Sequence, residues 1–126
     1  SKCHQQMNKE TILEIGLAML KTLEAVHSAG YVFNDLKLDN LMIGINQKVL
    51  KPKEGISMFS QCSIHLVDFG YATKYQDNLG KHIKEDTIDN FRGNLMFASS
   101  CSLDFCTTSR RDDLISVCYI LIFLLN

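Results

Sequence analysis

Four polar residues beside two short apolar segments have the types that phosphoryl transfer requires. Asn40 directly precedes the first segment, and Asp68 directly follows the second. Asp35 lies five residues before Asn40, with Lys37 between them. Amide and carboxylate oxygens are hard ligands that suit Mg²⁺. A carboxylate can accept a hydroxyl proton, and a lysine can neutralise phosphate charge. These residues predict a magnesium-dependent site for phosphoryl transfer.

Two short strands have to bring these residues together. Residues 41–45 and 64–67 are too short for helices and are bounded by polar residues or glycine, which predicts strands. In an antiparallel pair the start of one strand lies beside the end of the other, about 4.8 Å away. The hairpin would then place Asn40 next to Asp68. The polar stretch 46–63 is long for a hairpin loop, and we expect a surface insertion there.

A helix is predicted before this site, over residues 11–29. Thr11 and Glu14 fit the capping-box pattern at its start, and Gly30 suits its C-terminal stop. Apolar residues at helical spacing form a stripe that should face the core: Ile12, Leu13, Leu17, Leu20, Leu23 and Val26. Residues 70–109 are mostly polar and have no clear period.

At the four polar residues the sequence resembles a protein kinase. Residues 33–40 (F-N-D-L-K-L-D-N) line up with the H-R-D-L-x-x-x-N catalytic loop, and residues 68–70 are the D-F-G motif. The rest of the chain is most similar to the casein kinase 1 family. Residues 93–99 (G-N-L-M-F-A-S) stand where that family has G-T-A-R-Y-A-S, and residues 109–114 match its S-R-R-D-D-L run. The resemblance extends from about the first helix to the last residue.

The resemblance implies an α+β, protein-kinase-like fold. Residues 1–126 would be part of the kinase domain, namely the mainly helical C-terminal lobe with a short catalytic-loop β-hairpin. Residues 71–109 would be the activation and substrate-binding segment. The sequence contains no Gly-rich loop and no strand lysine with its helix glutamate, so we expect the N-terminal lobe to be absent. The apolar run 114–125 would be the long central helix of the lobe, with its apolar sides exposed in this fragment.

The resemblance also implies a function and a role for each matching residue. The intact protein would be a serine/threonine kinase that transfers the γ-phosphate of ATP to protein hydroxyls, while the fragment alone would be inactive. Asp35 would accept the hydroxyl proton, and Lys37 would stabilise the transferring phosphoryl group. The cofactors would be ATP, bound by Lys37, Asn40, Met42, Val67 and Asp68, and Mg²⁺, held by Asn40 and Asp68. Structural support of the site would come from Asp113, Phe69, Gly70 and Gly93.

Departures from the family pattern leave an alternative function open. Phe33 and Asn34 stand at the His and Arg of H-R-D, and Asn94 replaces a Thr that supports the catalytic Asp and Lys. Met96 replaces an Arg that helps to bind an anion or a primed substrate, so we expect weaker dependence on acidic or primed substrates. The alternative is a pseudokinase that acts as a binding or scaffolding module. The intact Asp35, with the other three polar residues, opposes it.

The composition limits the classes of partner. An apolar content of 46% and a net charge of −1 exclude a disordered chain and give no reason to expect nucleic acid. A membrane-associated protein is a third alternative. However, a bilayer span needs about 20 residues, and the terminal apolar run is shorter than that. The resemblance implies protein substrates with Ser or Thr as partners, and the composition and the short apolar run lead us to expect neither nucleic acid nor a membrane span.

The five cysteines predict reduced thiols. They form no C-x-x-C pair and follow no signal peptide, which indicates an intracellular, cytoplasmic or nuclear location. Zinc can be considered at Cys62 with His65, or at Cys101 with Cys106. Neither pair has a second pair at the spacing of a structural zinc site, so the sequence disfavours both. Cys118 is expected to pack in the core.

Overall fold

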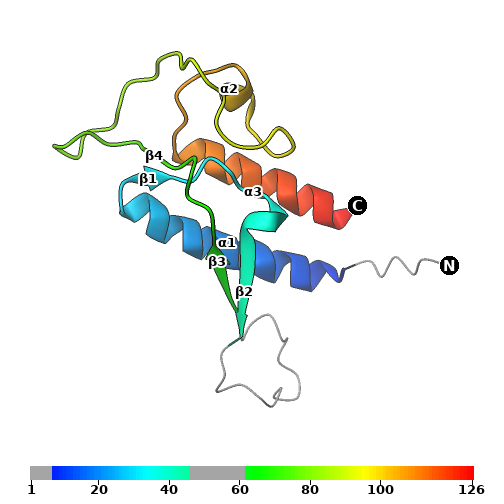
Figure 1. The fold of residues 1–126 in the computed structure, drawn as a ribbon. Coiled ribbons are helices and arrows are strands. Elements are labelled where there is room, and N and C mark those ends of the chain that lie inside the picture. Colours follow the sequence, from blue (N-terminus) through cyan, green and yellow to red (C-terminus); the bar gives the residue numbers. More distant parts are fainter. Residues whose placement is uncertain (1–6, 46–61) are drawn as a thin grey trace.

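The computed structural model describes residues 7–45 and 62–126, without the side chains of Ile45 and Cys62. Over these residues the chain is a small α+β structure with three α-helices and two antiparallel two-stranded sheets (Figure 1). The helices are α1 (Lys9–Ser28), α2 (Ser100–Leu103) and α3 (Arg110–Leu125), with a 3-10 turn at Leu38–Asn40. Strand β1 (Tyr31–Val32) pairs with β4 (Thr73–Lys74), and β2 (Leu41–Ile45) pairs with β3 (Cys62–Leu66). The α+β class expected from the sequence is confirmed.

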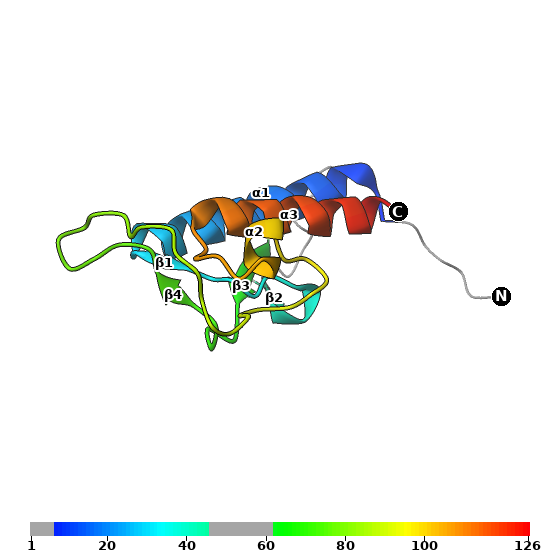
Figure 2. The same cartoon turned by 90° about the horizontal axis from the view of Figure 1, so that it is seen from above.

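Helices α1 and α3 form one layer, and the strands and loops form the other. The two helices lie side by side and run in opposite directions in both views (Figures 1 and 2). The core lies between this layer and the chain that follows β1, and it is made of Ile15, Met19, Leu23, Phe33, Leu36, Phe97, Val117 and Ile120. The β2–β3 hairpin packs on this core through Leu41, Ile64 and Leu66. The hairpin and the chain after β1 are therefore held against the same apolar surface.

Helix α1 begins earlier than the sequence predicted. The side chain of Asn8 accepts a hydrogen bond from the Glu10 amide at 3.0 Å, so the helix starts at Lys9. The predicted capping box at Thr11 is wrong, because Asn8 is already an effective N-cap. The predicted stop is close: the helix ends at residue 28, and Gly30 has a φ of +91°. That left-handed conformation favours glycine and turns the chain into β1.

The buried face of α1 also differs from the predicted stripe. Leu13, Leu17 and Leu20 are 64%, 60% and 42% exposed, so their predicted burial is wrong. Ile12 and Leu23 of the predicted stripe are buried, and the other buried positions are Ile15, Gly16, Met19 and His27. At Gly16 a Cβ atom would lie 3.1 Å from the Leu121 side chain of α3, so the two helices approach closely there. Apolar residues cover a wide arc of α1. The close contact with α3 determines which part of that arc is buried.

Helix α3 is buried along one side only. At its start the Asp112 carboxylate accepts a hydrogen bond from the Ser109 amide at 2.7 Å. Val117 and Ile120 face the core, whereas Leu114, Tyr119, Ile122, Phe123 and Leu125 are exposed, as expected for the apolar sides of this helix. Cys118 is exposed, so its predicted core position is wrong: it neighbours Val117 in sequence but points about 100° away around the helix. No helix in the described part of the chain is long and apolar enough to cross a membrane.

The β2–β3 hairpin has the predicted antiparallel arrangement. Leu41 lies opposite Leu66, and the second strand starts two residues earlier than predicted. The predicted surface insertion 46–63 is wrong at its end, because Ser63 belongs to β3 and pairs with Gly44. Residues 46–61 of that insertion lie outside the described residues. The hairpin nevertheless begins directly after Asn40 and ends two residues before Asp68, one residue earlier than predicted, which is what positions the candidate site.

Candidate active site

The carboxylate of Asp35 is the centre of the site. Asp35 lies in the loop formed by residues 33–40, between β1 and β2, and is 2% exposed. Its Oδ2 accepts a hydrogen bond from Asn40 Nδ2 at 3.0 Å, and its Oδ1 accepts one from Asn94 Nδ2 at 3.1 Å. The Lys37 Nζ atom lies 4.0 Å from Oδ2. Two amides and an ammonium group therefore fix and compensate a buried negative charge.

A second buried carboxylate fixes the beginning of this loop. Asp113 of α3 is 1% exposed, and its Oδ2 accepts a hydrogen bond from the Phe33 amide at 2.8 Å. Its Oδ1 accepts one from the Asn34 amide at 2.9 Å. His27 Nε2 lies 2.8 Å from Oδ2, which adds α1 to the same cluster. This bracing of the loop backbone is the contact that the resemblance implied for Asp113.

Asn34 connects the 33–40 loop to the segment that follows β3. Its φ of 69° is left-handed, a conformation that asparagine tolerates better than most residues. Its Nδ2 donates to the carbonyl of Tyr71 at 2.8 Å and to Thr73 Oγ1 at 2.9 Å. Thr108 Oγ1 donates to Asn34 Oδ1 at 2.5 Å. Asn34, at the arginine position of the motif, is therefore a neutral residue whose side-chain amide forms hydrogen bonds with the Tyr71 carbonyl and with the hydroxyls of Thr73 and Thr108.

The end of the hairpin places the D-F-G residues beside the loop. The Val67 amide donates to the Asn40 carbonyl at 3.0 Å, which extends the ladder to the residue before Asp68. Asp68 is exposed, and the Phe69 ring contacts the Phe33 ring edge-to-face with 5.0 Å between centroids. Phe33, at the histidine position of the motif, therefore packs against the second motif. The Asp68 Oδ1 atom accepts a hydrogen bond from the Gly70 amide at 3.2 Å.

The two predicted magnesium ligands carry oxygen atoms of the type that Mg²⁺ prefers. Asn40 is 5% exposed, and its Nδ2 donates to both the backbone carbonyl and the carboxylate of Asp35. Its amide oxygen is left as the side-chain acceptor, with no hydrogen bond to it among the described residues. Asp68 offers an exposed carboxylate on the adjoining strand end. An amide oxygen and a carboxylate are a donor set that fits Mg²⁺ together with phosphate oxygens.

Gly93 and Asn94, in the segment between β4 and α2, contact the 33–40 loop. Gly93 has a φ of +117°, and a Cβ atom there would lie 2.3 Å from the Asn34 carbonyl oxygen. This close approach lets Asn94 reach the loop, where its Nδ2 also donates to the Leu36 carbonyl at 2.9 Å. The sequence marked Asn94 only as a departure from the family threonine. In the structure the asparagine contacts Asp35 directly, so the substitution supplies a donor to the same carboxylate.

Of the predicted ATP-binding residues, Met42 lies in β2 and Val67 directly follows β3. Met42 is 54% exposed and lies opposite His65, on the face away from the Leu41–Leu66 pair that packs on the core. Val67 is half-buried. Neither side chain is enclosed by the residues that the structure describes. The fold therefore presents Met42 on an open face of the hairpin.

His27 is the residue near the site that sequence reasoning missed. In the sequence, His27 belongs to no metal-ligand or nucleophile pattern. Only its position four residues after Leu23 indicated that it lies on the buried face of α1.

A comparison with models of known protein families finds none that matches the chain. The kinase interpretation therefore depends on the sequence motifs and on the contacts described above.

Proposed function

We propose that the chain is the catalytic-loop part of a serine/threonine protein kinase of the casein kinase 1 type. The observation that carries the proposal is the buried Asp35 carboxylate, held between the amides of Asn40 and Asn94 with Lys37 Nζ 4.0 Å away. Burying a charge is unfavourable unless it is compensated, and these three groups compensate the Asp35 carboxylate and hold it in place. The arrangement suits a base that must keep one orientation while a hydroxyl approaches.

Each residue has a separate part in the proposed reaction. Asp35 accepts the proton of the substrate hydroxyl as its oxygen attacks the γ-phosphate of ATP. Lys37 neutralises charge on the transferring phosphoryl group. Asn40 and Asp68 would hold Mg²⁺, which neutralises the phosphate oxygens of the nucleotide. Asp113 acts through the backbone by holding the loop in the required conformation.

The alternative is a pseudokinase that binds partners without transferring phosphate. The neutral Asn34 at the arginine position favours this alternative. In the sequence, the replacement of the family threonine by Asn94 also favoured the pseudokinase. In the structure Asn94 donates a hydrogen bond to Asp35, so this replacement does not favour the pseudokinase. The two proposals differ in whether phosphate is transferred.

The test compares Asp35→Asn with Asp39→Asn in the natural protein that contains this chain. Asp39 is an exposed aspartate of the same loop, which makes it a matched control. We expect transfer of labelled γ-phosphate from ATP to casein to fall about 10²–10⁴-fold in Asp35→Asn, because a general base contributes that much. The control should retain its rate.

Two outcomes would contradict the kinase proposal. Unchanged transfer in Asp35→Asn would exclude Asp35 as the base. No transfer by the unsubstituted protein would favour the pseudokinase. Residues 1–126 alone should not transfer phosphate, since the sequence holds neither a Gly-rich loop nor its partner lysine for the nucleotide phosphates.

A further inference from the structure

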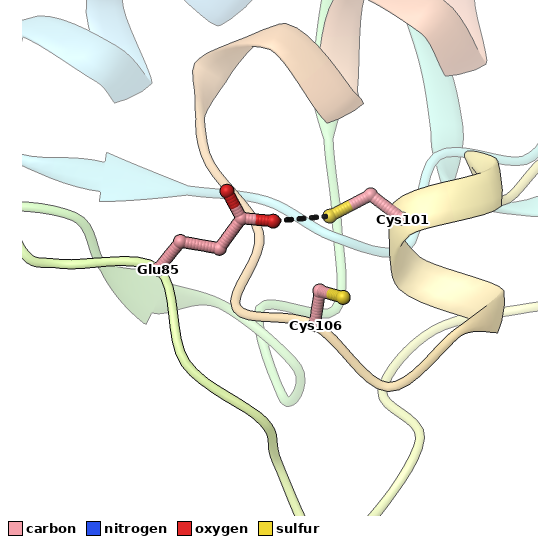
Figure 3. Close-up of side chains that lie close together, drawn as sticks. All are labelled: Glu85, Cys101 and Cys106. Carbon is pink, nitrogen blue, oxygen red and sulfur yellow. Dashed lines mark hydrogen bonds between the residues drawn. The ribbon is translucent and has the colours of Figure 1, made fainter.

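Three side chains with metal-binding atoms lie together beside α2 and take no part in the Asp35 site. They are Glu85, Cys101 and Cys106, whose ligand atoms all lie within 4.8 Å of one another. Figure 3 shows the Glu85 carboxylate pointing at the Cys101 sulfur, with the Cys106 sulfur close to both. The Cys101 Sγ atom is 3.9 Å from Glu85 Oε1. Two thiols and a carboxylate converge here from two segments of the chain.

The backbone holds the two cysteines on the same side. Helix α2 ends at Leu103, and Phe105 then has a left-handed φ of 58°. The chain turns back, so that the Cys106 amide donates to the Cys101 carbonyl at 3.0 Å. On a regular helix, two cysteines five residues apart would point in different directions. The turn after α2 brings Cys101 and Cys106 together instead.

Glu85 is brought to the cysteines by pairing between distant segments. The Thr107 amide donates to the Asp86 carbonyl at 2.8 Å, and the Ile88 amide donates to the Phe105 carbonyl at 2.8 Å. The Thr107 hydroxyl donates to the Asp86 carbonyl at 3.0 Å. Because these bonds follow Glu85 directly on one segment and flank Cys106 on the other, the backbone of Glu85 is held beside the two cysteines.

We propose that Glu85, Cys101 and Cys106 form a Zn²⁺ site, with two thiolates, one carboxylate oxygen and a water as ligands. Tetrahedral Zn²⁺ with Zn–S bonds of about 2.3 Å and a Zn–O bond of about 2.1 Å requires S···S of about 3.8 Å and S···O of about 3.6 Å. The Glu85–Cys101 distance of 3.9 Å is within a few tenths of an ångström of that requirement. As the two Zn–S bonds form, the two thiol protons pass to solvent.

The Arg111 guanidinium is the cation beside the proposed zinc–thiolate centre, and it also lies 3.8 Å from the Asp112 carboxylate. Two thiolates and a carboxylate carry three negative charges, so Zn²⁺ leaves a net charge of −1. The Arg111 guanidinium donates to Cys101 Sγ at 3.4 Å and can balance that charge. Hydrogen bonds to ligand atoms from such outer groups orient and stabilise metal ligands. Soft sulfur ligands also favour Zn²⁺ over Mg²⁺ or Ca²⁺.

The sequence disfavoured zinc because no second cysteine or histidine pair has the required spacing. The structure supplies a glutamate as the third ligand instead.

The test titrates the full chain, reduced and free of metal, with Zn²⁺ alone and with Co²⁺ alone. We expect one Zn²⁺ per chain, and a Co²⁺ complex with a thiolate-to-cobalt charge-transfer band. Cys106→Ser should weaken Zn²⁺ binding at least about 100-fold and abolish that band, and Glu85→Gln should weaken binding at least about 10-fold, since even outer-shell changes cost 10–100-fold. Cys118→Ser, at an exposed cysteine of α3, is the matched control and should bind normally.

Several results would overturn the proposal. One is a reduced chain that retains no Zn²⁺. Another is binding that survives both Cys106→Ser and Glu85→Gln, or that Cys118→Ser weakens equally, since the metal would then lie elsewhere. A third is a Cys101–Cys106 disulfide, found by mass spectrometry, in a chain that binds no Zn²⁺ after reduction. Glu85→Gln changes one exposed side chain, and circular dichroism checks that it leaves the fold intact.

Discussion

Asp113 shows how one buried charge can organise a loop. Its two oxygens receive the Phe33 amide, the Asn34 amide and the His27 ring nitrogen at 2.8–2.9 Å. Each of these groups would be left without a partner if the carboxylate were removed, and unpaired buried polar groups cost about 1–3 kcal/mol each. The position of Asp35, two residues beyond Phe33, is therefore set by a side chain that does not touch it in any described contact.

Gly93 gives a prediction at the same scale. Gly93→Ala should destabilise the fold for two reasons. The new Cβ atom would lie 2.3 Å from the Asn34 carbonyl oxygen, and the alanine would have to adopt a left-handed φ. Gly80→Ala is the matched control, since Gly80 has a φ of +77° and nothing within 4 Å of the Cβ position. We expect a cost of about 1–2 kcal/mol at Gly80 from the backbone alone. Gly93 should cost about 1–3 kcal/mol more, measured by urea unfolding.

Equal destabilisation at the two glycines would contradict this prediction. It would mean that the chain around Asn34 moves aside without cost. The 33–40 loop would then be far less fixed than its hydrogen bonds indicate.

The sequence could identify the types of residue at the site but not all of their contacts. Asp35, Asn40 and Asp68 were predictable as a group, because a local hairpin brings the last two together. The contact of Asn94 with Asp35 was not, since it joins residues 59 positions apart and depends on the left-handed Gly93. The same limit explains why Glu85 was not grouped with the two cysteines.

At the scale of elements, the strands were easier to predict than the faces of the helices. The β2–β3 hairpin follows from two short apolar segments and their local pairing. Helix α1 was predicted as a helix, but its buried face was not, because apolar residues occupy more than one side. The partner that selects the face is α3, which lies at the other end of the sequence. Periodicity describes one helix and contains no information about its partner.

Two leucines of α1 test which face is buried. Leu23 is 1% exposed and Leu17 is 60% exposed, although the sequence placed both on one stripe. Leu23→Ala should lower the free energy of unfolding by about 2–5 kcal/mol, because it leaves a cavity in the core. Leu17→Ala should change it by no more than about 0.5 kcal/mol. Urea unfolding followed by circular dichroism measures both, and similar losses would mean that Leu17 is also packed.

At the scale of the whole molecule, the proposed kinase function leads to a prediction about charge and substrate selection. The chain has a net charge of −1, and neutral Asn34 and Met96 stand where the family has arginines. We expect peptides with and without an upstream phosphoserine to differ less than about 10-fold in kcat/KM, because a charge-assisted hydrogen bond to the phosphate is missing. Met96 is 64% exposed, so Met96→Arg has space to restore the charge.

The expected result for Met96→Arg is a larger preference for the primed peptide, with little change for the unprimed one. A strong preference for the primed peptide in the unsubstituted protein would contradict the prediction. The phosphate would then have to be bound by other cations of the molecule.

The bonds to Asp113 also affect the order in which the molecule can fold. They join it to Phe33 and His27 across 80 and 86 positions of the chain. Contacts between such distant residues form slowly, because a long loop must close before they stabilise anything. On the ribosome, α1 can form as soon as it emerges, whereas the 33–40 loop has to wait until residue 113 has been synthesised. The segment that holds Asp35 is therefore among the last parts of this chain to become ordered.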